Sequence, residues 1–206
     1  MTTKVAIINY GIGNIRSLYN SLKKLNVEAE IILDPELIYN FNKVFLPGVG
    51  SYKDAIDLIR KKGWEKSIKN FSSDKNKKLF GICVGMQILS TYGYEYGKSN
   101  GLDIIKGDVE HMNKQGCNLK LPHIGWNSIN ILNKSLITDN LPNDSDFYFV
   151  NSYSFKIVNS DALIATTKYG IEFPSIINKY NVFGTQFHPE KSSKAGMQIL
   201  KNFIDA

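Results

Sequence analysis

The chain contains only two cysteines, Cys83 and Cys117, among 206 residues. Two thiols are too few for a disulfide framework or a cysteine-rich zinc site, so we expect reduced thiols and no metal site. No apolar run approaches the ~18 residues of a membrane-spanning helix. Residues 1–5 lead directly into an apolar strand without a signal-peptide pattern, which predicts a cytoplasmic protein.

Arginine is almost absent, although the formal net charge is +6. Only Arg16 and Arg60 are arginines, and the remaining basic residues are lysines scattered along the chain. Proteins that read nucleic acids depend on arginine forks and clustered basic patches. The composition therefore argues against a nucleic-acid partner, and the missing apolar spans argue against a membrane partner.

Phosphate-binding loops are also missing from the sequence. Neither a G-x-G-x-x-G pattern nor a Walker lysine is present, and we expect no cofactor. The chain has no internal repeat, low-complexity tract or linker-like stretch, and its hydrophobic content of 43% is ordinary for a folded protein. We therefore expect one domain spanning residues 1–206 with a substantial core.

Apolar strands and amphipathic helices alternate in the first half of the chain. Strands are expected at residues 4–10, 28–33 and 43–46. Between and after them, apolar residues at helical spacing predict helices over residues 15–25 and 51–59. Alternation of this kind is the pattern of a parallel α/β sheet.

The second half changes character, because short β-like runs follow one another without intervening helices. These runs lie at residues 105–109, 126–132, 146–150, 162–167, 175–178 and 182–187. Apolar positions between residues 195 and 204 recur at helical spacing and predict a closing helix. The sequence therefore predicts an α/β domain with an antiparallel or mixed addition.

One stretch, residues 79–89, organises the chain. A short apolar run ends at Cys83, which has Gly81 two positions before it and Gly85 two positions after it, and apolar residues at helical spacing continue to Tyr92. This is the layout of a nucleophile elbow, in which glycines permit a sharp strand-to-helix turn and the helix terminus favours a thiolate. The alternative is that Cys83 is a small buried hydrophobe, as most free cysteines are.

A thiol nucleophile needs a base, and the chain has three histidines. His188 follows an apolar strand and precedes Pro189 and Glu190. Because proline favours an extended backbone before it, Glu190 is expected on the same side as His188, where a carboxylate would fix the imidazole tautomer. The alternative is a solvated loop at a strand end. His111 is expected at the surface, and His123 lies in an unusual loop with no carboxylate nearby in sequence.

An oxyanion hole has two candidate sources in the sequence. One is the backbone N–H of Val84, directly after Cys83. The other is the loop Gly48-Val49-Gly50 after a neighbouring strand, since glycines permit peptide orientations that aim N–H groups at a developing negative charge. The alternatives for this loop are a plain strand-to-helix connection and a phosphate cradle, and the second lacks its motif.

Six short motifs extend nearly from one end of the chain to the other. They lie at residues 9–14, 46–50, 81–87, 122–127, 149–153 and 186–192. Together they resemble the class I, triad-type glutamine amidotransferases, and within this family the glutaminase subunits of imidazole glycerol phosphate synthases. The motifs around Cys83 and His188 are general to triad amidotransferases, whereas the first, second and fourth motifs are specific to the subfamily.

The resemblance implies a flavodoxin-like fold with a mixed, mostly parallel sheet flanked by helices. It also implies that Cys83 is the nucleophile, His188 the base and then the acid, and Glu190 the residue that orients His188. A larger set of positions receives binding and interface roles from the same resemblance. Glutamine would be held by Gly50, Gln87, Ser152 and Tyr153; Val49 and Val84 would supply the oxyanion N–H groups; Asn14 and Trp126 would lie near a partner interface.

The activity implied by the resemblance is hydrolysis of glutamine to glutamate. Cys83 would attack the side-chain amide, His188 would protonate the leaving ammonia, and water would then release glutamate from a thioester. The ammonia would be channelled to a (β/α)8-barrel synthase (cyclase) subunit in a heterodimer. That partner would make imidazole glycerol phosphate and aminoimidazole carboxamide ribotide (AICAR) in histidine biosynthesis.

Two positions depart from the subfamily pattern, with Asn9 in place of the usual Asp and Asn151 in place of the usual His. Neither belongs to the triad set, so the departures bear on the partner and the ammonia acceptor. Three alternatives stay open. They are a paralogue that supplies ammonia to a different synthase, such as one amidating a surface sugar; a non-catalytic binding subunit; and a stand-alone thiol hydrolase.

Overall fold

The computed structural model describes residues 4–158 and 160–206, so the expected entry of residues 1–3 into a strand lies outside the described part. The helices are α1 (Ile15–Lys24), α2 (Tyr52–Lys61), α3 (Trp64–Ser73), α4 (Val84–Gln87) and α5 (Ser193–Asp205). The strands are β1 (Lys4–Ile8), β2 (Glu28–Ile32), β3 (Lys43–Gly48), β4 (Lys78–Cys83), β5 (Tyr92–Gly93), β6 (Ser99–Asn100), β7 (Gly107–His111), β8 (His123–Ser128), β9 (Asn130–Ile131), β10 (Asp146–Asn151), β11 (Tyr153–Ile157), β12 (Leu163–Tyr169), β13 (Ile171–Lys179) and β14 (Val182–Thr185).

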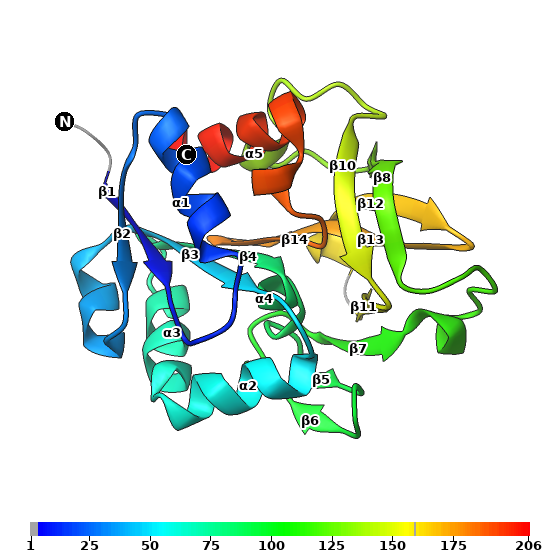
Figure 1. Ribbon diagram of the computed structural model, residues 1–206, viewed down its shortest axis with the longest axis horizontal. Coiled ribbons are helices and arrows are strands. Elements are labelled where there is room, and N and C mark those ends of the chain that lie inside the picture. The colour runs from blue at the N-terminus through cyan, green and yellow to red at the C-terminus, as the bar shows by residue number, and fades with distance from the viewer. Residues whose placement is uncertain (1–3, 159) are drawn as a thin grey trace.

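The largest sheet has the strand order β2-β1-β3-β4-β14-β13-β12-β9. Neighbours from β2 to β14 are parallel, and those from β14 to β9 are antiparallel. The parallel part has the 2-1-3-4-5 order of flavodoxin-like sheets, in which ligands bind outside the carboxyl ends of the strands. Helices α1 and α5 cover one face of this part, and α2 and α3 cover the other (Figure 1). The predicted fold class is therefore confirmed.

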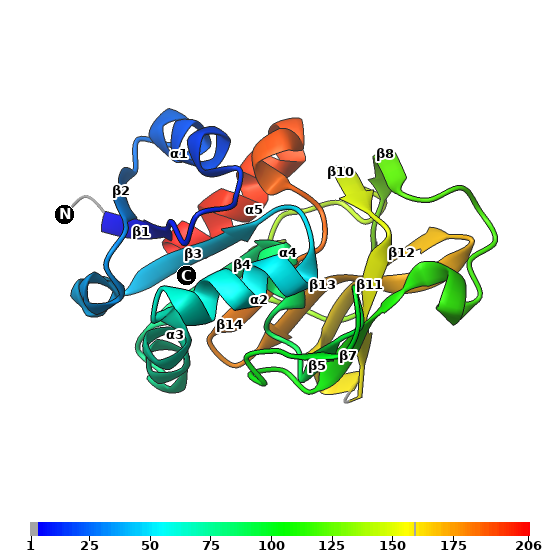
Figure 2. The same ribbon diagram turned by 60° about the horizontal axis from the view of Figure 1, so that its bottom comes forward.

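Two smaller sheets supply the antiparallel and mixed addition. One pairs β10 with β8, and the other has the order β11-β7-β5-β6. Both lie at the end of the molecule away from β1 and β2 (Figures 1 and 2). The connection between β10 and β11 reaches the carboxyl end of β4, where Ser152 and Cys83 line the same cavity.

The core lies on both faces of the parallel strands, because these strands carry continuous apolar runs. Residues 5–8 of β1 are fully buried. Under α5, the rings of Phe45, Phe80 and Phe203 have centroids between 4.9 and 5.6 Å apart. Burying one phenylalanine side chain contributes about 1.5–3 kcal/mol. This cluster therefore fixes the closing helix against the centre of the sheet.

The helix after Cys83 is shorter than the sequence predicts. It comprises only Val84–Gln87, and Tyr92 lies in β5 rather than on the helix. The carbonyl oxygen of Ile88 accepts a hydrogen bond of 2.8 Å from the backbone N–H of Leu102, a residue beyond β6. Long-range backbone pairing thus replaces the helical continuation that the local apolar spacing indicates.

Two further segments differ from the sequence prediction. The stretch with His123, predicted as a loop, forms β8, because it pairs antiparallel with β10 and sets His123 opposite Asn151. Helix α3 was not predicted, although Trp64, Ile68 and Phe71 are buried on one side of it. Its remaining positions are polar, so the apolar spacing is sparse.

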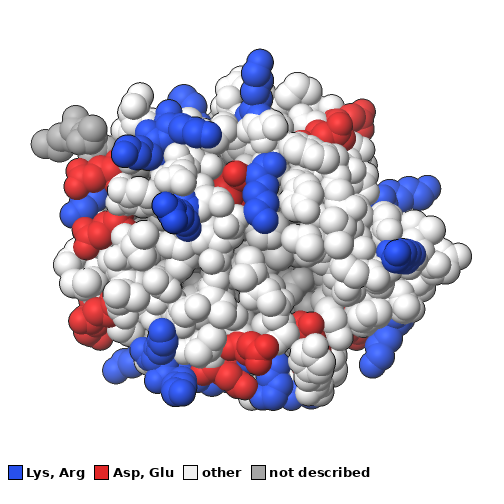
Figure 3. All heavy atoms as spheres, in the orientation of Figure 1, with Lys and Arg blue, Asp and Glu red and all other residues white. Residues whose placement is uncertain are grey.

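Charges of both signs are mixed on the surface. Figure 3 shows Lys and Arg over α1 and along the edge formed by α2 and α3, where Asp and Glu lie among them. On these two helices, Lys53 pairs with Asp57 and Lys69 pairs with Glu65, each at 2.7 Å. No helix among residues 4–158 and 160–206 is long and apolar enough to cross a membrane.

Gly85 is a point of very close packing. A Cβ at this position would lie 1.8 Å from the carbonyl oxygen of Leu46. We expect Gly85→Ala to lower the free energy of unfolding by about 3 kcal/mol or more, because backbone on both sides must move. Urea unfolding followed by circular dichroism measures the loss.

Gly97→Ala is the matched control for this substitution. Gly97 has a φ of 104°, so a side chain there costs about 1–2 kcal/mol of backbone strain. Nothing lies within 4 Å of its added Cβ. Equal losses for the two variants would contradict the argument from close packing at Gly85.

Candidate active site

Cys83 ends β4 and precedes α4 in a strained backbone conformation. Its φ of 54° and ψ of −113° are unusual for a residue with a side chain. A Cβ on Gly81 would lie 2.6 Å from the carbonyl oxygen of Gly85, so the chain turns this sharply only with glycine there. The glycine-flanked turn inferred from the sequence is present, and it sets the thiol at the carboxyl end of a central strand.

Pairing of β14 with β4 brings His188 to Cys83. The two strands are parallel, and Thr185 at the end of β14 lies beside Ile82 of β4. The residues after Thr185 therefore continue alongside Cys83. This register brings together Cys83 and His188, which lie about one hundred positions apart in the sequence.

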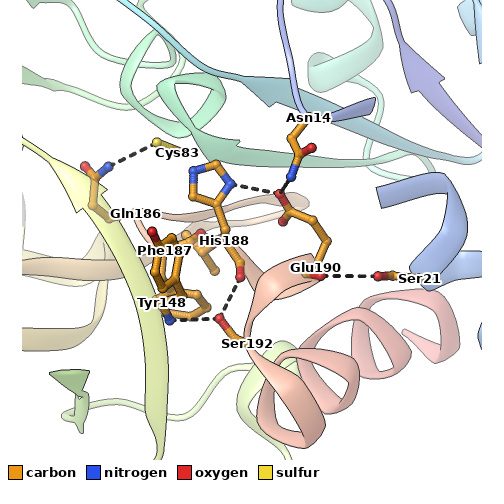
Figure 4. A network of polar contacts seen from close by, with 10 residues as sticks. Asn14, Ser21, Cys83, Tyr148, Gln186, Phe187, His188, Glu190 and Ser192 are labelled. Atoms are coloured by element: carbon orange, nitrogen blue, oxygen red, sulfur yellow. Dashed lines mark hydrogen bonds and ion pairs between the residues drawn. The ribbon is translucent and has the colours of Figure 1, made fainter. Parts of the chain in front are cut away.

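Successive side chains after β14 point in opposite directions. Phe187 enters the core and stacks on Phe147, with ring centroids 4.0 Å apart. Gln186 and His188, on either side of Phe187 in the chain, both lie on the side of Cys83 (Figure 4). The two-residue period of extended chain thus gives the thiol two polar neighbours.

A buried carboxylate pairs with the far nitrogen of His188. Nδ1 of His188 lies 2.8 Å from Oε1 of Glu190, and both side chains are 1% exposed. The segment Pro189–Lys191 forms the 3-10 helix η5 instead of the expected extended chain. Proline is favoured in the first turn of a helix, so the expected contact is reached through a turn.

Further polar contacts hold this pair in place. Nδ2 of Asn14, at the start of α1, donates to the same Oε1 of Glu190 at 2.9 Å. Oγ of Ser192 donates to the carbonyl oxygen of His188 at 2.6 Å and accepts from the N–H of Tyr148 at 3.0 Å (Figure 4). The imidazole is therefore fixed by α1, by β10 and by the entry to α5.

Cys83, His188 and Glu190 form a buried row of groups that can carry alternating charge. Burial alone would lower the pKa of His188, but Cys83 and then Glu190 outweigh it and raise the pKa to about 10. An anionic Cys83 and an anionic Glu190 thus both favour the protonated form of His188. Its Nε2 faces the sulfur and makes no well-formed hydrogen bond within the described residues, which leaves its proton for a group bound at Cys83 (Figure 4).

The other two histidines lie in different settings. His123 is buried in β8 and stacks on Tyr169 with ring centroids 4.0 Å apart, and burial lowers its pKa. His111 is half-buried at the end of β7, and its Nδ1 accepts from the N–H of Asn113 at 3.3 Å. Neither hydrogen-bonds to a carboxylate in the part of the chain that the structure describes.

A cavity of about 290 Å³ opens at Cys83. Most of the residues singled out in the sequence line it, namely Val49, Gly50, Cys83, Val84, Gln87, Ser152, Tyr153 and His188. Glu190 is behind His188, and neither Asn14 nor Trp126 is among the lining residues. Its size and mixed polar and apolar walls suit a small molecule such as an amino acid.

Glu95 lines the same cavity, although sequence reasoning did not select it. Its Oε2 accepts a hydrogen bond of 2.7 Å from the backbone N–H of Tyr52. Burial raises the pKa of Glu95, and this hydrogen bond offsets part of that rise. Because Glu95 lies in a short hairpin, no periodicity in the sequence could have pointed to it. A carboxylate in this position can bind an ammonium group.

Gln186 is a second neighbour of Cys83 that sequence reasoning missed. It is fully buried, and its Nε2 lies 3.8 Å from Sγ of Cys83. Gln87 donates from Nε2 to Oε1 of Gln186 and to the carbonyl oxygen of Tyr153, both at 3.0 Å. The alternation around Phe187 was the signal that could have revealed it.

The two departures from the subfamily pattern make local contacts. Oδ1 of Asn9 accepts from the N–H of Gly11 at 3.1 Å and closes a turn ahead of α1. Asn151 lines the cavity, and its Nδ2 donates to the carbonyl oxygen of Tyr153 at 3.1 Å. Of the two, only Asn151 is placed to affect what the cavity accepts.

The two positions expected at a partner interface differ in exposure. Asn14 turns inward to Glu190. Trp126 on β8 is 54% exposed, and Ile124, two positions earlier on the same strand, is 60% exposed. Large apolar side chains exposed together on one strand are typical of contact surfaces.

Comparison with known proteins gives matches over nearly the whole chain. The model of the family described as glutamine amidotransferase class-I matches residues 6–206. Imidazole glycerol phosphate synthase subunit HisH of Caldanaerobacter subterraneus subsp. tengcongensis is 44% identical over 199 residues, which cover 97% of this chain and 96% of that protein. The protein of the same name from Pelagibacter ubique is 41% identical over 205 residues, covering 98% and 99%.

Solved structures share the architecture at lower identity. PurLQS from Thermotoga maritima superposes with a TM-score of 0.77 at 17% identity, covering 100% of this chain and 99% of that one. A glutamine amidotransferase crystal structure superposes with a TM-score of 0.76 at 19% identity, covering 98% and 97%. At these identities the likeness supports the fold.

We expect His188 to keep its charge well above the pH at which an ordinary histidine loses it. With a pKa of about 10 instead of 6.5, the imidazole stays protonated at neutral pH and loses its proton only as the pH rises toward 10. Imidazole NMR over a pH series measures this titration. A midpoint near 6.5 in the unmodified chain would contradict the claim that Cys83 and Glu190 raise the pKa of His188.

Two variants separate the causes of this shift. Cys83→Ser removes the larger attraction and is expected to lower the pKa of His188 most, while Glu190→Gln is expected to lower it less. The same NMR titration reads both variants. The reverse order would show that Glu190 dominates the charge on His188.

Proposed function

We propose, from the premise that this chain belongs to the class I glutamine amidotransferase family, that it is the glutaminase subunit of an imidazole glycerol phosphate synthase. The observation that carries this proposal is the buried row Cys83, His188 and Glu190 at one end of a cavity of about 290 Å³. A nucleophile, a base and an orienting carboxylate in that order are what acyl transfer through a thiol requires.

In this proposal, glutamine is held by its α-ammonium group and by its α-carboxylate. The carboxylate of Glu95 and Oε1 of Gln87 bind the α-ammonium group. Gly50 and the backbone of Ser152 and Tyr153 bind the α-carboxylate. Support comes from the cavity walls, where all five residues lie. The side-chain amide of glutamine then extends toward Cys83.

The first half of the reaction makes a thioester and ammonia. Sγ of Cys83 attacks the amide carbon, and the carbonyl electrons move to oxygen. The N–H groups of Val84 and Val49 bind that oxyanion. When the carbonyl re-forms, the C–N bond breaks, and the nitrogen leaves as ammonia with the proton from Nε2 of His188. Glu190 holds the imidazole in place throughout.

The second half restores the enzyme. Neutral His188 takes a proton from water, whose oxygen attacks the thioester carbon. The C–S bond breaks, and the thiolate of Cys83 again faces a protonated His188. The new carboxyl group gives up the second proton of the water to solvent, and the product leaves as glutamate. Each residue ends in the state in which it began, so no cofactor enters the balance.

The released ammonia would be protonated and diluted in water, so a useful glutaminase delivers it directly. We place the acceptor on a (β/α)8-barrel cyclase subunit bound as a heterodimer, with Trp126 and Asn14 near the contact. Residues 1–206 act as one glutaminase domain in the cytoplasm. The exposed Trp126 and Ile124 support a partner surface and speak against a stand-alone hydrolase. The buried triad speaks against a non-catalytic subunit.

Cys83→Ala tests the nucleophile. We expect glutamine-dependent activity to fall below detection, because no other thiol reaches the cavity, while the partner still turns over with ammonium salts. Glutamate release and product formation by the complex measure both. Cys117→Ala is the matched control, since Cys117 hydrogen-bonds to Tyr169 away from the cavity. Unchanged glutamine hydrolysis by Cys83→Ala would refute the mechanism.

Partner dependence tests the assignment within the family. We expect slow glutamate release by the isolated chain and a rise of at least about a hundredfold with the cyclase subunit and its bound acceptor. In this proposal the liganded partner turns one peptide of the loop Gly48-Val49-Gly50 and so completes the oxyanion hole, and one such donor is worth about a hundredfold in rate. Stopped-flow assays of the chain, the complex and the liganded complex give the comparison. Equal rates in all three would favour a stand-alone hydrolase. Activation only by another synthase would identify a paralogue.

A further inference from the structure

Gln186 is placed beside the sulfur of Cys83 by the same register that places His188. It directly follows Thr185, which pairs with Ile82, so Gln186 comes level with Cys83. The backbone N–H of Gln186 donates to the carbonyl oxygen of Ser175 at 2.9 Å, and the residue is fully buried. None of the catalytic steps proposed above uses it.

A backbone carbonyl determines which way the Gln186 amide points. The carbonyl oxygen of Tyr153 can only accept, so the atom of Gln87 that lies 3.0 Å from it is the amide nitrogen. The second N–H of Gln87 donates to Oε1 of Gln186. Nε2 of Gln186 is thereby turned toward Sγ of Cys83 (Figure 4). Reversing either amide would set two oxygens or two nitrogens against each other.

We propose that Gln186 is a positioning residue for the nucleophile: it donates one N–H to the sulfur of Cys83 and holds it, as a thiolate, opposite His188. A hydrogen bond to a charged acceptor is stronger than one between neutral groups, so the amide favours the thiolate over the thiol. No proton is transferred. The relay from the Tyr153 carbonyl through Gln87 keeps the donor in place.

The amide has a further use that rests on the proposed function. While the thioester exists, His188 has given up its proton. Gln186 is then the donor that remains beside the sulfur, ready for the thiolate that leaves when water attacks. Gln87 also lines the cavity, and both of its N–H groups are engaged, so a ligand that binds its oxygen steadies the anchor of Gln186.

The test is the pH dependence of alkylation of Cys83 by iodoacetamide, followed on the peptide that contains it. Gln186→Met keeps the size of the side chain and loses the donor. We expect the pH at which alkylation reaches half its maximal rate to rise by about one unit. Gln186→Glu keeps the acceptor for Gln87 but sets a like charge beside the sulfur, so we expect a larger rise. An unchanged midpoint in either folded variant overturns the proposal.

Gln115→Met is the matched control. Gln115 is a half-buried amide that donates to Glu110 and Ser154 and does not line the cavity. We expect no shift of the alkylation midpoint, and an equal shift would overturn the proposal by showing a general structural effect. Thermal melting identifies folded variants, and if Gln186→Met does not fold, Gln186→Glu decides alone.

Alkylation requires neither glutamine nor a partner, so this test is independent of the proposed function. A chain whose midpoint shifts as expected but which hydrolyses no glutamine would keep the role of Gln186 and refute the glutaminase. A chain that hydrolyses glutamine but shows no shift would do the opposite.

Discussion

The parallel pairing of β4 with β14 is the constraint on which the candidate site depends. It sets Thr185 beside Ile82, and the next residues of each strand are then the ones that meet at the carboxyl edge of the sheet. Cys83 owes its proximity to Gln186 and His188 to this register, because the two segments lie far apart in the sequence. The aromatic cluster under α5 and the stacking of Phe187 on Phe147 make the register costly to change.

Burying a row of ionisable groups is unfavourable unless each charge has a partner. Here Glu190 receives hydrogen bonds from His188 and Asn14, and His188 faces the sulfur. Neutral donors stand at both ends of the row, Asn14 beside the carboxylate and Gln186 beside the sulfur. The strained φ of Cys83 adds a further local cost that the rest of the core must offset. The turn at Cys83 therefore lowers the stability of the fold while it supplies the reactive thiol.

Patterns with local causes were predictable from the sequence. The glycines around Cys83 indicate the turn because the backbone there leaves no room for a side chain. The alternation of strands and helices indicates the parallel sheet. Glu95 and Gln186 escaped prediction because their places depend on a short hairpin and on strand register. The continuation of α4 to Tyr92 was wrong because backbone pairing with Leu102 ends the helix. The route from His188 to Glu190 is a 3-10 turn, which residue spacing alone does not reveal.

In the segment from β14 to His188, the number of residues determines which side chains face the thiol. Phe187 fills the core while its two neighbours in the chain face the thiol, so the side of the strand on which each residue lies is set by counting in twos. A substitution at one position changes one contact. An insertion or deletion of a single residue would exchange the two sides, moving an aromatic ring toward the thiol and an imidazole into the core. Evolution or engineering can therefore alter the chemistry of this stretch but not its length.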